Sequence, residues 1–274
     1  MELKLEKIKF NYETIGEGTP VICLHGYFQD HKIMKGSLEP IFTQRKGYRR
    51  IYFDLPGMGK TSGYEWIESA DDILDTIIEF IDEVVPEKNF ILIGDSYGAY
   101  LARGILHKKW EQVDGICLIS PVIIPEKEKR ELPDHEIIFQ DKTFLSTHNS
   151  SELSEFQQLM VIQNERTWNR FQDEIFTGIQ LADPEFLKKV AENEYSFSFD
   201  VDKFKDTFEN PSLFIVGRQD AYVGYRDAIT ILDNFPHATF TILDAAGHGV
   251  QIEQEKLFNN LMNNWLTRLE EIYN

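Results

Sequence analysis

The chain has few cysteines and no long apolar run. Only 2 of its 274 residues are cysteines, which excludes the disulfide framework that stabilises many small secreted domains. Cys23 and Cys117 each lie within a short apolar stretch, so we expect two buried thiols. No segment approaches the roughly 20 apolar residues that a membrane-spanning helix needs. The N-terminus also lacks the apolar core of a secretory signal, and these absences together predict a cytoplasmic protein.

Basic residues are scarce beside acidic ones. The sequence holds 28 Lys and Arg against 46 Asp and Glu, a net charge of −18. This charge repels phosphate backbones and anionic lipid surfaces, and no basic stripe runs through the sequence. We therefore expect no nucleic-acid partner and no membrane partner. The remaining composition is that of an ordinary globular domain, and the sequence does not indicate an oligomeric state.

Apolar runs of strand length alternate with helical patterns in two parts of the chain. The runs are nearly continuous, which is typical of parallel strands buried on both faces, and they cover residues 21–25, 50–54, 90–94, 115–120, 212–216 and 239–243. Helical spacing of apolar residues predicts helices over 70–85, 99–110 and 257–269. Alternation over 3–10 predicts an antiparallel edge strand. The pattern as a whole predicts an α/β fold with a doubly wound, mostly parallel sheet.

The strand pattern stops at Pro121 and resumes at Ser212. Between them the sequence predicts helices near residues 152–164, 168–179 and 184–194, and no buried parallel strand. We therefore divide the chain into a core, residues 1–120 and 206–274, and a helical cap or lid, residues 121–205. The cap is rich in aromatic residues, some of which would line a pocket for a small molecule with an apolar portion. Arg166 and Arg170 could reach a substrate carboxylate, but we expect both on a solvated helix face.

The segment Gly94-Asp95-Ser96-Tyr97-Gly98 has the pattern Gly-x-Ser-x-Gly. It follows an apolar run and precedes a helical pattern, which is the context of a nucleophile elbow. The two glycines leave room for a tight bend that exposes the serine oxygen beside the first amides of the helix. The sequence therefore predicts Ser96 as a nucleophile. Asp95 is expected to be a polar wall or turn residue.

A nucleophilic serine needs a base to accept its proton and an acid to orient that base. Asp220 and His248 follow the strand-like runs 212–216 and 239–243. Because the carboxyl ends of parallel strands meet at one edge of a sheet, we expect both to lie near Ser96. The sequence predicts a catalytic triad of Ser96, Asp220 and His248. Activity should fall below a pH near ~6.5 as the imidazole becomes protonated.

With this elbow and the order Ser, Asp, His, the chain resembles the α/β-hydrolase fold family, in its serine hydrolase subgroup with a helical cap. The resemblance implies that the cap is inserted after the sixth strand. It also matches His25-Gly26 to the family's motif after the third strand. The backbone N–H groups of Tyr27 and Tyr97 would then form the oxyanion hole. Gln251 and Glu253 fit a Gly-His-x-x-Gln-x-Glu pattern and would anchor the histidine loop.

These features predict a carboxylesterase-like serine hydrolase that cleaves a small ester or lactone through an acyl-enzyme, without a metal or organic cofactor. Hydrolysis of a C–C bond and prolyl aminopeptidase-like cleavage remain alternatives on the same triad. Gly249 speaks against the first, because C–C hydrolases of this fold commonly have tryptophan there. A ligand receptor or regulatory partner with little turnover is the alternative outside enzymes. Residues 54–61 end in Gly-Lys-Thr but lack the first glycine of a phosphate-binding loop, which excludes nucleotide binding.

Overall fold

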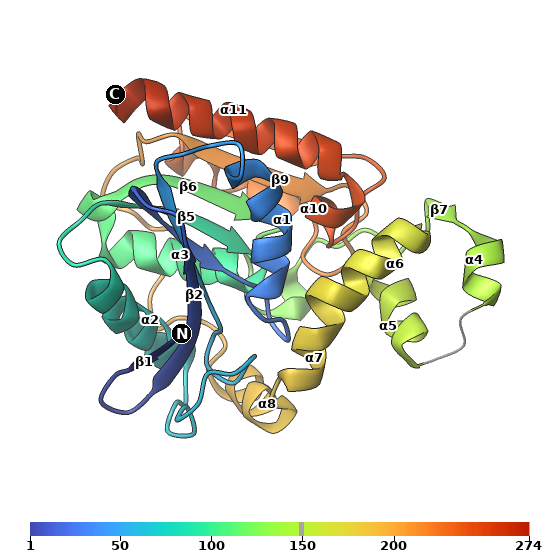
Figure 1. The fold of residues 1–274 in the computed structure, drawn as a ribbon, viewed down its shortest axis with the longest axis horizontal. Helices are drawn as coiled ribbons and strands as arrows, with labels where there is room; N and C mark the ends of the chain where they lie inside the picture. Colours follow the sequence, from blue (N-terminus) through green and yellow to red (C-terminus); the bar gives the residue numbers. More distant parts are fainter. Residues whose placement is uncertain (148–150, 274) are drawn as a thin grey trace.

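The computed structural model describes residues 1–147 and 151–273, and an eight-stranded sheet runs through this part of the chain. The strand order is β1-β2-β4-β3-β5-β6-β9-β10 (Figure 1). The strands are β1 (Glu2–Lys4), β2 (Lys9–Ile15), β3 (Thr19–Leu24), β4 (Tyr48–Phe53), β5 (Phe90–Asp95), β6 (Val113–Ile119), β9 (Ser212–Gly217) and β10 (Ala238–Leu243). Pairing is antiparallel for β1 with β2 and for β2 with β4, and parallel elsewhere. The predicted doubly wound, mostly parallel sheet is confirmed.

Helices cover both faces of the sheet. Helices α1 (Lys32–Phe42) and α11 (Glu255–Tyr273) pack on one face, against side chains that include Ile91 and Ile93 of β5. Helices α2 (Ala70–Val84) and α3 (Tyr97–Lys108) pack on the other face, against Leu92 of the same strand. Successive residues of a strand point to opposite faces, so both sets are buried. This explains the continuous apolar runs, and Cys23 and Cys117 are the free, buried thiols expected.

Local sequence signals account for α2 but not for α1. Helix α2 begins with a capping box in which Ser69 and Asp72 exchange hydrogen bonds, a strong start signal. Helix α1 contains Gly36 and Pro40, which disfavour a helix in its interior, and the sequence did not predict it. A side chain at Gly36 would meet the carboxyl group of Glu174. The close packing of α1 on the inserted segment therefore explains the glycine.

The segment between β6 and β9 is mostly helical and projects to one side of the sheet, where α4 to α7 lie (Figure 1). Its helices are α4 (Lys142–Ser146), α5 (Ser151–Leu159), α6 (Glu165–Phe171), α7 (Thr177–Leu181) and α8 (Pro184–Asn193). A π-helical turn, Gln172–Phe176, joins α6 to α7. Two short strands, β7 (Phe139–Gln140) and β8 (Ile162–Gln163), pair with each other in parallel. Residues 148–150 of this segment lie outside the described residues.

Two predicted elements were wrong in extent. The helix expected to reach residue 164 ends at Leu159, because the N–H groups of Val161 and Ile162 donate to the carboxylate of Glu253. The strand expected over residues 3–10 is divided by a turn, in which the N–H of Leu5 donates to the carbonyl of Ile8. The remaining short helices are α9 (Arg226–Ile229) and α10 (Val250–Glu253).

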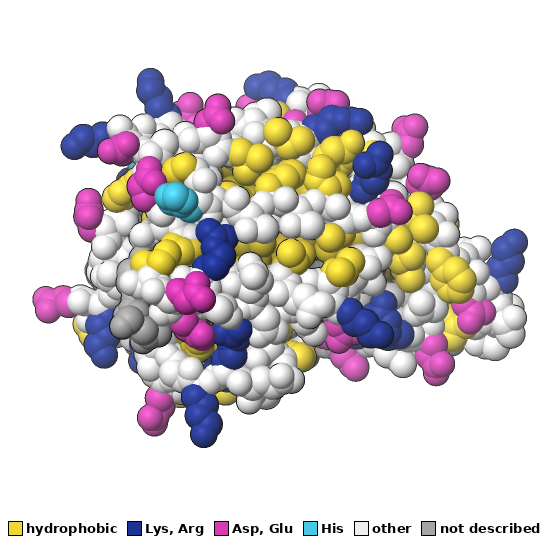
Figure 2. Space-filling model, turned by 90° about the horizontal axis from the view of Figure 1, so that it is seen from above, with side chains coloured by type: hydrophobic (Ala, Val, Ile, Leu, Met, Phe, Trp, Pro, Cys, Tyr) yellow, Lys and Arg dark blue, Asp and Glu magenta, His cyan; other side chains and the backbone are white. Residues whose placement is uncertain are grey.

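Positive and negative side chains are mixed on the face of the molecule seen in Figure 2. Lys and Arg side chains lie among Asp and Glu side chains there and do not gather into one patch. Hydrophobic side chains form bands between them. None of the helices over residues 1–147 and 151–273 is long and apolar enough to cross a membrane.

Candidate active site

Ser96 occupies a one-residue turn between β5 and α3. Its backbone has φ 54° and ψ −114°, a conformation that residues with side chains rarely adopt. A Cβ atom at Gly98 would meet the carbonyl oxygens of Leu24 and His25, and one at Gly94 would meet the backbone of Ala99. Both glycines are therefore required by close backbone approach, and the bend presents the Ser96 side chain at the carboxyl edge of the sheet.

The three residues predicted as a triad lie in hydrogen-bond contact. The Nε2 atom of His248 is 2.9 Å from the Oγ atom of Ser96, and its Nδ1 atom is 2.9 Å from Oδ2 of Asp220. Asp220 is fully buried, and its Oδ1 accepts the N–H groups of Tyr222 and Val223. A carboxylate at Nδ1 fixes the tautomer in which Nε2 accepts the serine proton.

The charges around His248 set its proton affinity. Burial acts to lower the pKa of the imidazole, but the charge and hydrogen bond of Asp220, together with the charge of Asp95, outweigh it. The pKa of His248 is therefore raised above its ordinary value of 6.5. The ring of Tyr222 stacks on the imidazole with centroids 5.4 Å apart, which restricts the motion of the imidazole.

A cavity of about 450 Å³ opens beside Ser96 and His248. Its walls are largely apolar and aromatic, and the inserted segment contributes Phe171, Ile175, Ile179 and Tyr195 to them. Tyr27 and Phe28, in the loop after β3, also line the cavity, and the ring of Tyr27 packs against that of Tyr195. Such a lining suits a small molecule with an apolar portion.

The predicted oxyanion-hole amides belong to Tyr27 and Tyr97. Tyr97 is the first residue of α3, so its N–H lacks an acceptor within the helix. Neither N–H donates a hydrogen bond to another group in the described part of the chain. His25 holds the loop of Tyr27 in place: its Nδ1 lies 2.8 Å from the carbonyl oxygen of Gly26, and its Nε2 accepts the N–H of Leu55.

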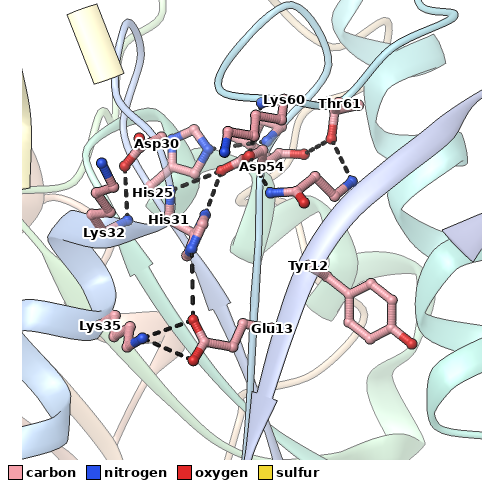
Figure 3. A network of polar contacts seen from close by, with 12 residues as sticks. Tyr12, Glu13, His25, Asp30, His31, Lys32, Lys35, Asp54, Lys60 and Thr61 are labelled. Carbon is pink, nitrogen blue, oxygen red and sulfur yellow. Dashed lines mark hydrogen bonds and ion pairs between the residues drawn. The ribbon is translucent and has the colours of Figure 1, made fainter. Parts of the chain in front are cut away.

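The turn after β4, which ends in Gly-Lys-Thr, is closed by Asp54. Figure 3 shows the Asp54 carboxylate among His31, Lys60 and their neighbours. Oδ1 of Asp54 lies 2.7 Å from Nδ1 of His31, and Oδ2 accepts the N–H of Lys60. Burial acts to raise the pKa of Asp54, but the hydrogen bond and charge of His31 lower it overall. An internal carboxylate thus takes the amide of Lys60, in agreement with the exclusion of nucleotide binding.

Glu253 joins the histidine loop to the inserted segment. Its Oε2 accepts the N–H of Gly247, the residue before His248, at 2.6 Å. Its Oε1 accepts the N–H groups of Val161 and Ile162 at 2.6 and 3.0 Å. Burial raises the pKa of this carboxyl group to about 7, although the three N–H donors oppose the rise. These contacts confirm the predicted anchoring role of Glu253. No local pattern in the sequence predicts its contact with Val161 and Ile162.

Arg166 and Arg170 also join the inserted segment to the core. The solvated face predicted for them holds for Arg166, whose side chain is 44% exposed, but not for Arg170, whose side chain is 15% exposed. Nη1 of Arg166 donates to the carbonyl of Ile252. Arg170 donates to the carbonyl of Gln251 and forms a bidentate pair with Glu174. The carbonyl groups of Ile252 and Gln251 lie far from these arginines in the sequence, so no local pattern predicts the contacts.

Asp95 lies behind the site and not in its wall. Its side chain is 1% exposed, and Oδ1 has no hydrogen-bond partner among the described residues. Burial raises the pKa of Asp95 to about 7, against the charge of His248, and the neighbouring Asp220 adds to the rise. Gln251 supplies a hydrogen bond to this carboxyl group. The structure therefore holds a second buried carboxyl group close to the imidazole.

The fold and this arrangement define a class of protein. A family model for the alpha/beta hydrolase fold matches residues 19–255, and the chain belongs to this family. The parallel sheet, the elbow after β5 and the helices on both faces are the parts of the chain that the model spans.

Among solved structures, an alpha/beta superfamily hydrolase from Oenococcus oeni PSU-1 is 31% identical, with a TM-score of 0.88 over 98% of this chain and 99% of that one. The 2-hydroxy-6-oxononadienedioate/2-hydroxy-6-oxononatrienedioate hydrolase 2 of Pseudomonas putida is 22% identical over 94% of this chain and 92% of its own. The pimeloyl-[acyl-carrier protein] methyl ester esterase of Legionella pneumophila (strain Paris) is 24% identical over 92% of this chain and 96% of its own. These relatives are hydrolases by name.

The contact of Gly98 with the loop after β3 predicts that Gly98→Ala destabilises the fold. The added methyl group must displace backbone carbonyls, which costs about 1–3 kcal/mol in a packed interior. Chemical denaturation followed by circular dichroism would measure the loss. Gly249→Ala is the matched control, because its Cβ would meet only the terminal atoms of the Met160 side chain, which can move. Equal stability of the two variants would contradict this account of the elbow.

The raised pKa of Asp95 predicts a pH-dependent gain in stability for Asp95→Asn. The folded protein keeps a proton on Asp95 up to about pH 7, whereas the ordinary value is 3.8. Stability from this group is therefore lost as pH rises between these values, at up to about 1.4 kcal/mol per pH unit. Asp95→Asn should be more stable than wild type at pH 8 and should lose that advantage near pH 4.

Denaturant unfolding at pH 4, 6 and 8 would measure this difference. Asp134→Asn removes one negative charge from an exposed position and serves as the matched control. An Asp95→Asn variant that is less stable than wild type at pH 8 would show that the buried carboxylate is well accommodated.

Proposed function

We propose that the protein is a serine hydrolase that cleaves a small ester or lactone through an acyl-enzyme. The observation that carries the proposal is the pair of 2.9 Å contacts that link Ser96 to His248 and His248 to Asp220. The chain of contacts opens into a largely apolar cavity. The membership of the chain in a hydrolase family, and a relative named as a methyl ester esterase, support this reading.

In the proposed reaction, Nε2 of His248 takes the proton of Ser96 as its Oγ attacks the carbonyl carbon. The N–H groups of Tyr27 and Tyr97 would stabilise the oxyanion, an interaction worth about 3–4 kcal/mol for each donor in comparable sites. His248 then gives the proton to the leaving alcohol, and Asp220 stabilises the imidazolium between the two steps. Water, deprotonated by His248, releases the acid and restores Ser96.

Residues 121–205 would act as a cap over this reaction. Four of the residues that the inserted segment places in the cavity wall, Phe171, Ile175, Ile179 and Tyr195, would contact the apolar part of the substrate. Exclusion of water by such a cover strengthens the electrostatic interactions beneath it.

Cleavage of a C–C bond is a second candidate, favoured by the name of the relative from Pseudomonas putida. The space beside Gly249 argues against it. A Cβ atom there would lie 2.9 Å from both Sδ and Cε of Met160, so the tryptophan common in C–C hydrolases of this fold would require the Met160 side chain to move. A panel of ester, amide and dienoate substrates would separate this candidate, and prolyl aminopeptidase-like cleavage, from the esterase. A receptor would show near-stoichiometric reaction with every one of them.

The proposed nucleophile predicts that Ser96→Ala abolishes ester hydrolysis. With a short-chain 4-nitrophenyl ester, kcat should fall by about 1000-fold or more, because the triad acts as one unit. Ser120→Ala is the matched control, since the Ser120 hydroxyl is also buried but has no hydrogen-bond partner among the described residues. Turnover by Ser96→Ala at the wild-type rate would remove Ser96 from the mechanism.

The charge environment of His248 predicts where activity is lost at low pH. The imidazole must be neutral to act as a base, so activity falls as pH drops through its pKa. Because that pKa is raised, the fall in kcat/KM should be centred above pH 6.5. Asp95→Asn removes a carboxyl group whose charge contributes to the rise. Because the pKa of Asp95 is itself raised to about 7, this group is only partly ionised in that range, and the profile should move only slightly to lower pH. An acid limb well below pH 6.5 in the wild type would contradict the raised pKa.

A further inference from the structure

One cation in the wall of the catalytic cavity has only neutral partners. Arg130 lines the cavity beside Ser96 and His248. Its Nε donates to the carbonyl of Ile124 at 2.7 Å, its Nη2 to that of Pro125 at 2.7 Å, and its Nη1 to that of Tyr222 at 3.1 Å. The Tyr195 hydroxyl makes a further contact with it. These groups orient the guanidinium, but they carry no negative charge to balance it.

The carboxylates near Arg130 are bonded elsewhere. The pKa of Glu126 is lowered, chiefly by its hydrogen bond with Lys129 and in smaller part by the charge of Arg130. Burial raises the pKa of Asp227, and the charge of Arg130 opposes that rise. Glu126, however, pairs with Lys129 at 2.8 Å, and Asp227 accepts the N–H of Glu131. Within residues 1–147 and 151–273, no carboxylate forms an ion pair with Arg130, although 46 of the 274 residues are acidic.

The cavity wall as a whole has an excess of positive charge. Its charged members, apart from the site imidazole, are Arg130, Lys127 and Glu155. Glu155 of α5 and Lys127 are both exposed residues, so solvent screens both of these charges. Arg130, by contrast, is half-buried. A guanidinium held in an apolar wall without a counter-ion is costly unless an anion joins it.

Arg130 is connected to His248 through Tyr222. Its Nη1 binds the carbonyl of Tyr222, whose ring stacks on His248. Arg130 also lines a second cavity of about 670 Å³. Tyr27, Lys127 and Tyr195 likewise line both cavities. The guanidinium thus lies in the wall of both cavities and binds the backbone of the residue whose ring stacks on the imidazole.

We propose that the substrate carries an anionic group, of which a carboxylate is the simplest form, and that Arg130 binds it with help from Lys127 while the ester lies at Ser96. The inference rests on the proposed function and narrows its substrate class to acidic esters or lactones. A guanidinium offers a planar pair of N–H donors that fits a carboxylate. Arg166 and Arg170, the arginines of α6, are bonded to α10 and to Glu174 and do not line the cavity.

Two matched substrate pairs test the proposal. Mono-4-nitrophenyl adipate and 4-nitrophenyl hexanoate differ by a carboxylate on the acyl side, and 4-acetoxybenzoate and phenyl acetate differ by one on the alcohol side. Each kcat/KM is divided by the uncatalysed rate of the same ester. The wild type should prefer the anion in at least one pair by about 10- to 100-fold, the range expected of a charged hydrogen bond. Arg130→Gln should remove that preference and leave the neutral ester within about threefold of wild type.

Control variants separate charge from packing. Arg130→Lys keeps the charge and should retain part of the preference. Arg49→Gln removes an arginine that also donates to a backbone carbonyl, that of Val84, away from the cavity, and it should leave both pairs unchanged. Binding of adipate to Ser96→Ala, followed by calorimetry, should weaken at least tenfold when Arg130→Gln is added. This measurement does not depend on turnover.

The outcomes distinguish this inference from the function on which it rests. A wild type that turns over both neutral esters without any preference for the anions would overturn the role of Arg130 while leaving the hydrolase intact. An Arg130→Gln variant that slows neutral and anionic esters equally would do the same. If Ser96→Ala retains full activity, the proposed function itself fails. Should Arg130→Gln not fold, Arg130→Lys and Lys127→Gln decide the matter, and unchanged anion preference in both would overturn the proposal.

Discussion

The site depends on close backbone contacts that only glycine allows. At Gly98, the start of α3 lies directly against the carbonyl groups of Leu24 and His25 at the end of β3. This contact holds the turn of Ser96 beside the loop that carries Tyr27. At Gly217, the end of β9 lies directly against the carbonyl groups of Ala246 and Gly247, the residues before His248. The start of α3 and the end of β9 are thereby held against neighbouring backbone at separations that no larger residue would permit.

The parts of the site that sequence could predict are those attached to strand ends. Ser96, Asp220 and His248 each follow a short apolar run, and in a parallel sheet such ends meet at one edge. A local pattern could therefore predict which residues meet in space, because a parallel sheet brings the carboxyl ends of its strands to one edge. The fold was accessible for the same reason: alternating apolar runs and amphipathic helices leave few arrangements of a doubly wound sheet.

Other parts were inaccessible because they depend on contacts between distant segments. Helix α1 includes a glycine and a proline, and only its packing near Glu174 explains the first of these. The end of α5 is decided by Glu253, which lies far along the chain. Arg130 and Arg166 look alike in the sequence, yet one lines the cavity and the other is tied to α10. Their roles depend on which carbonyl groups lie within hydrogen-bond distance in the folded chain. Sequence periodicity does not predict these contacts.

Glu253 connects the inserted segment to the loop that carries His248 through one carboxyl group. Val161 and Ile162 account for two of the three N–H groups that its carboxylate accepts, and Gly247 accounts for the third. If Val161 and Ile162 moved away from the core, this buried carboxyl group would lose two of its three N–H donors. The position of the inserted segment and the support of the loop that carries His248 are therefore coupled through a single side chain.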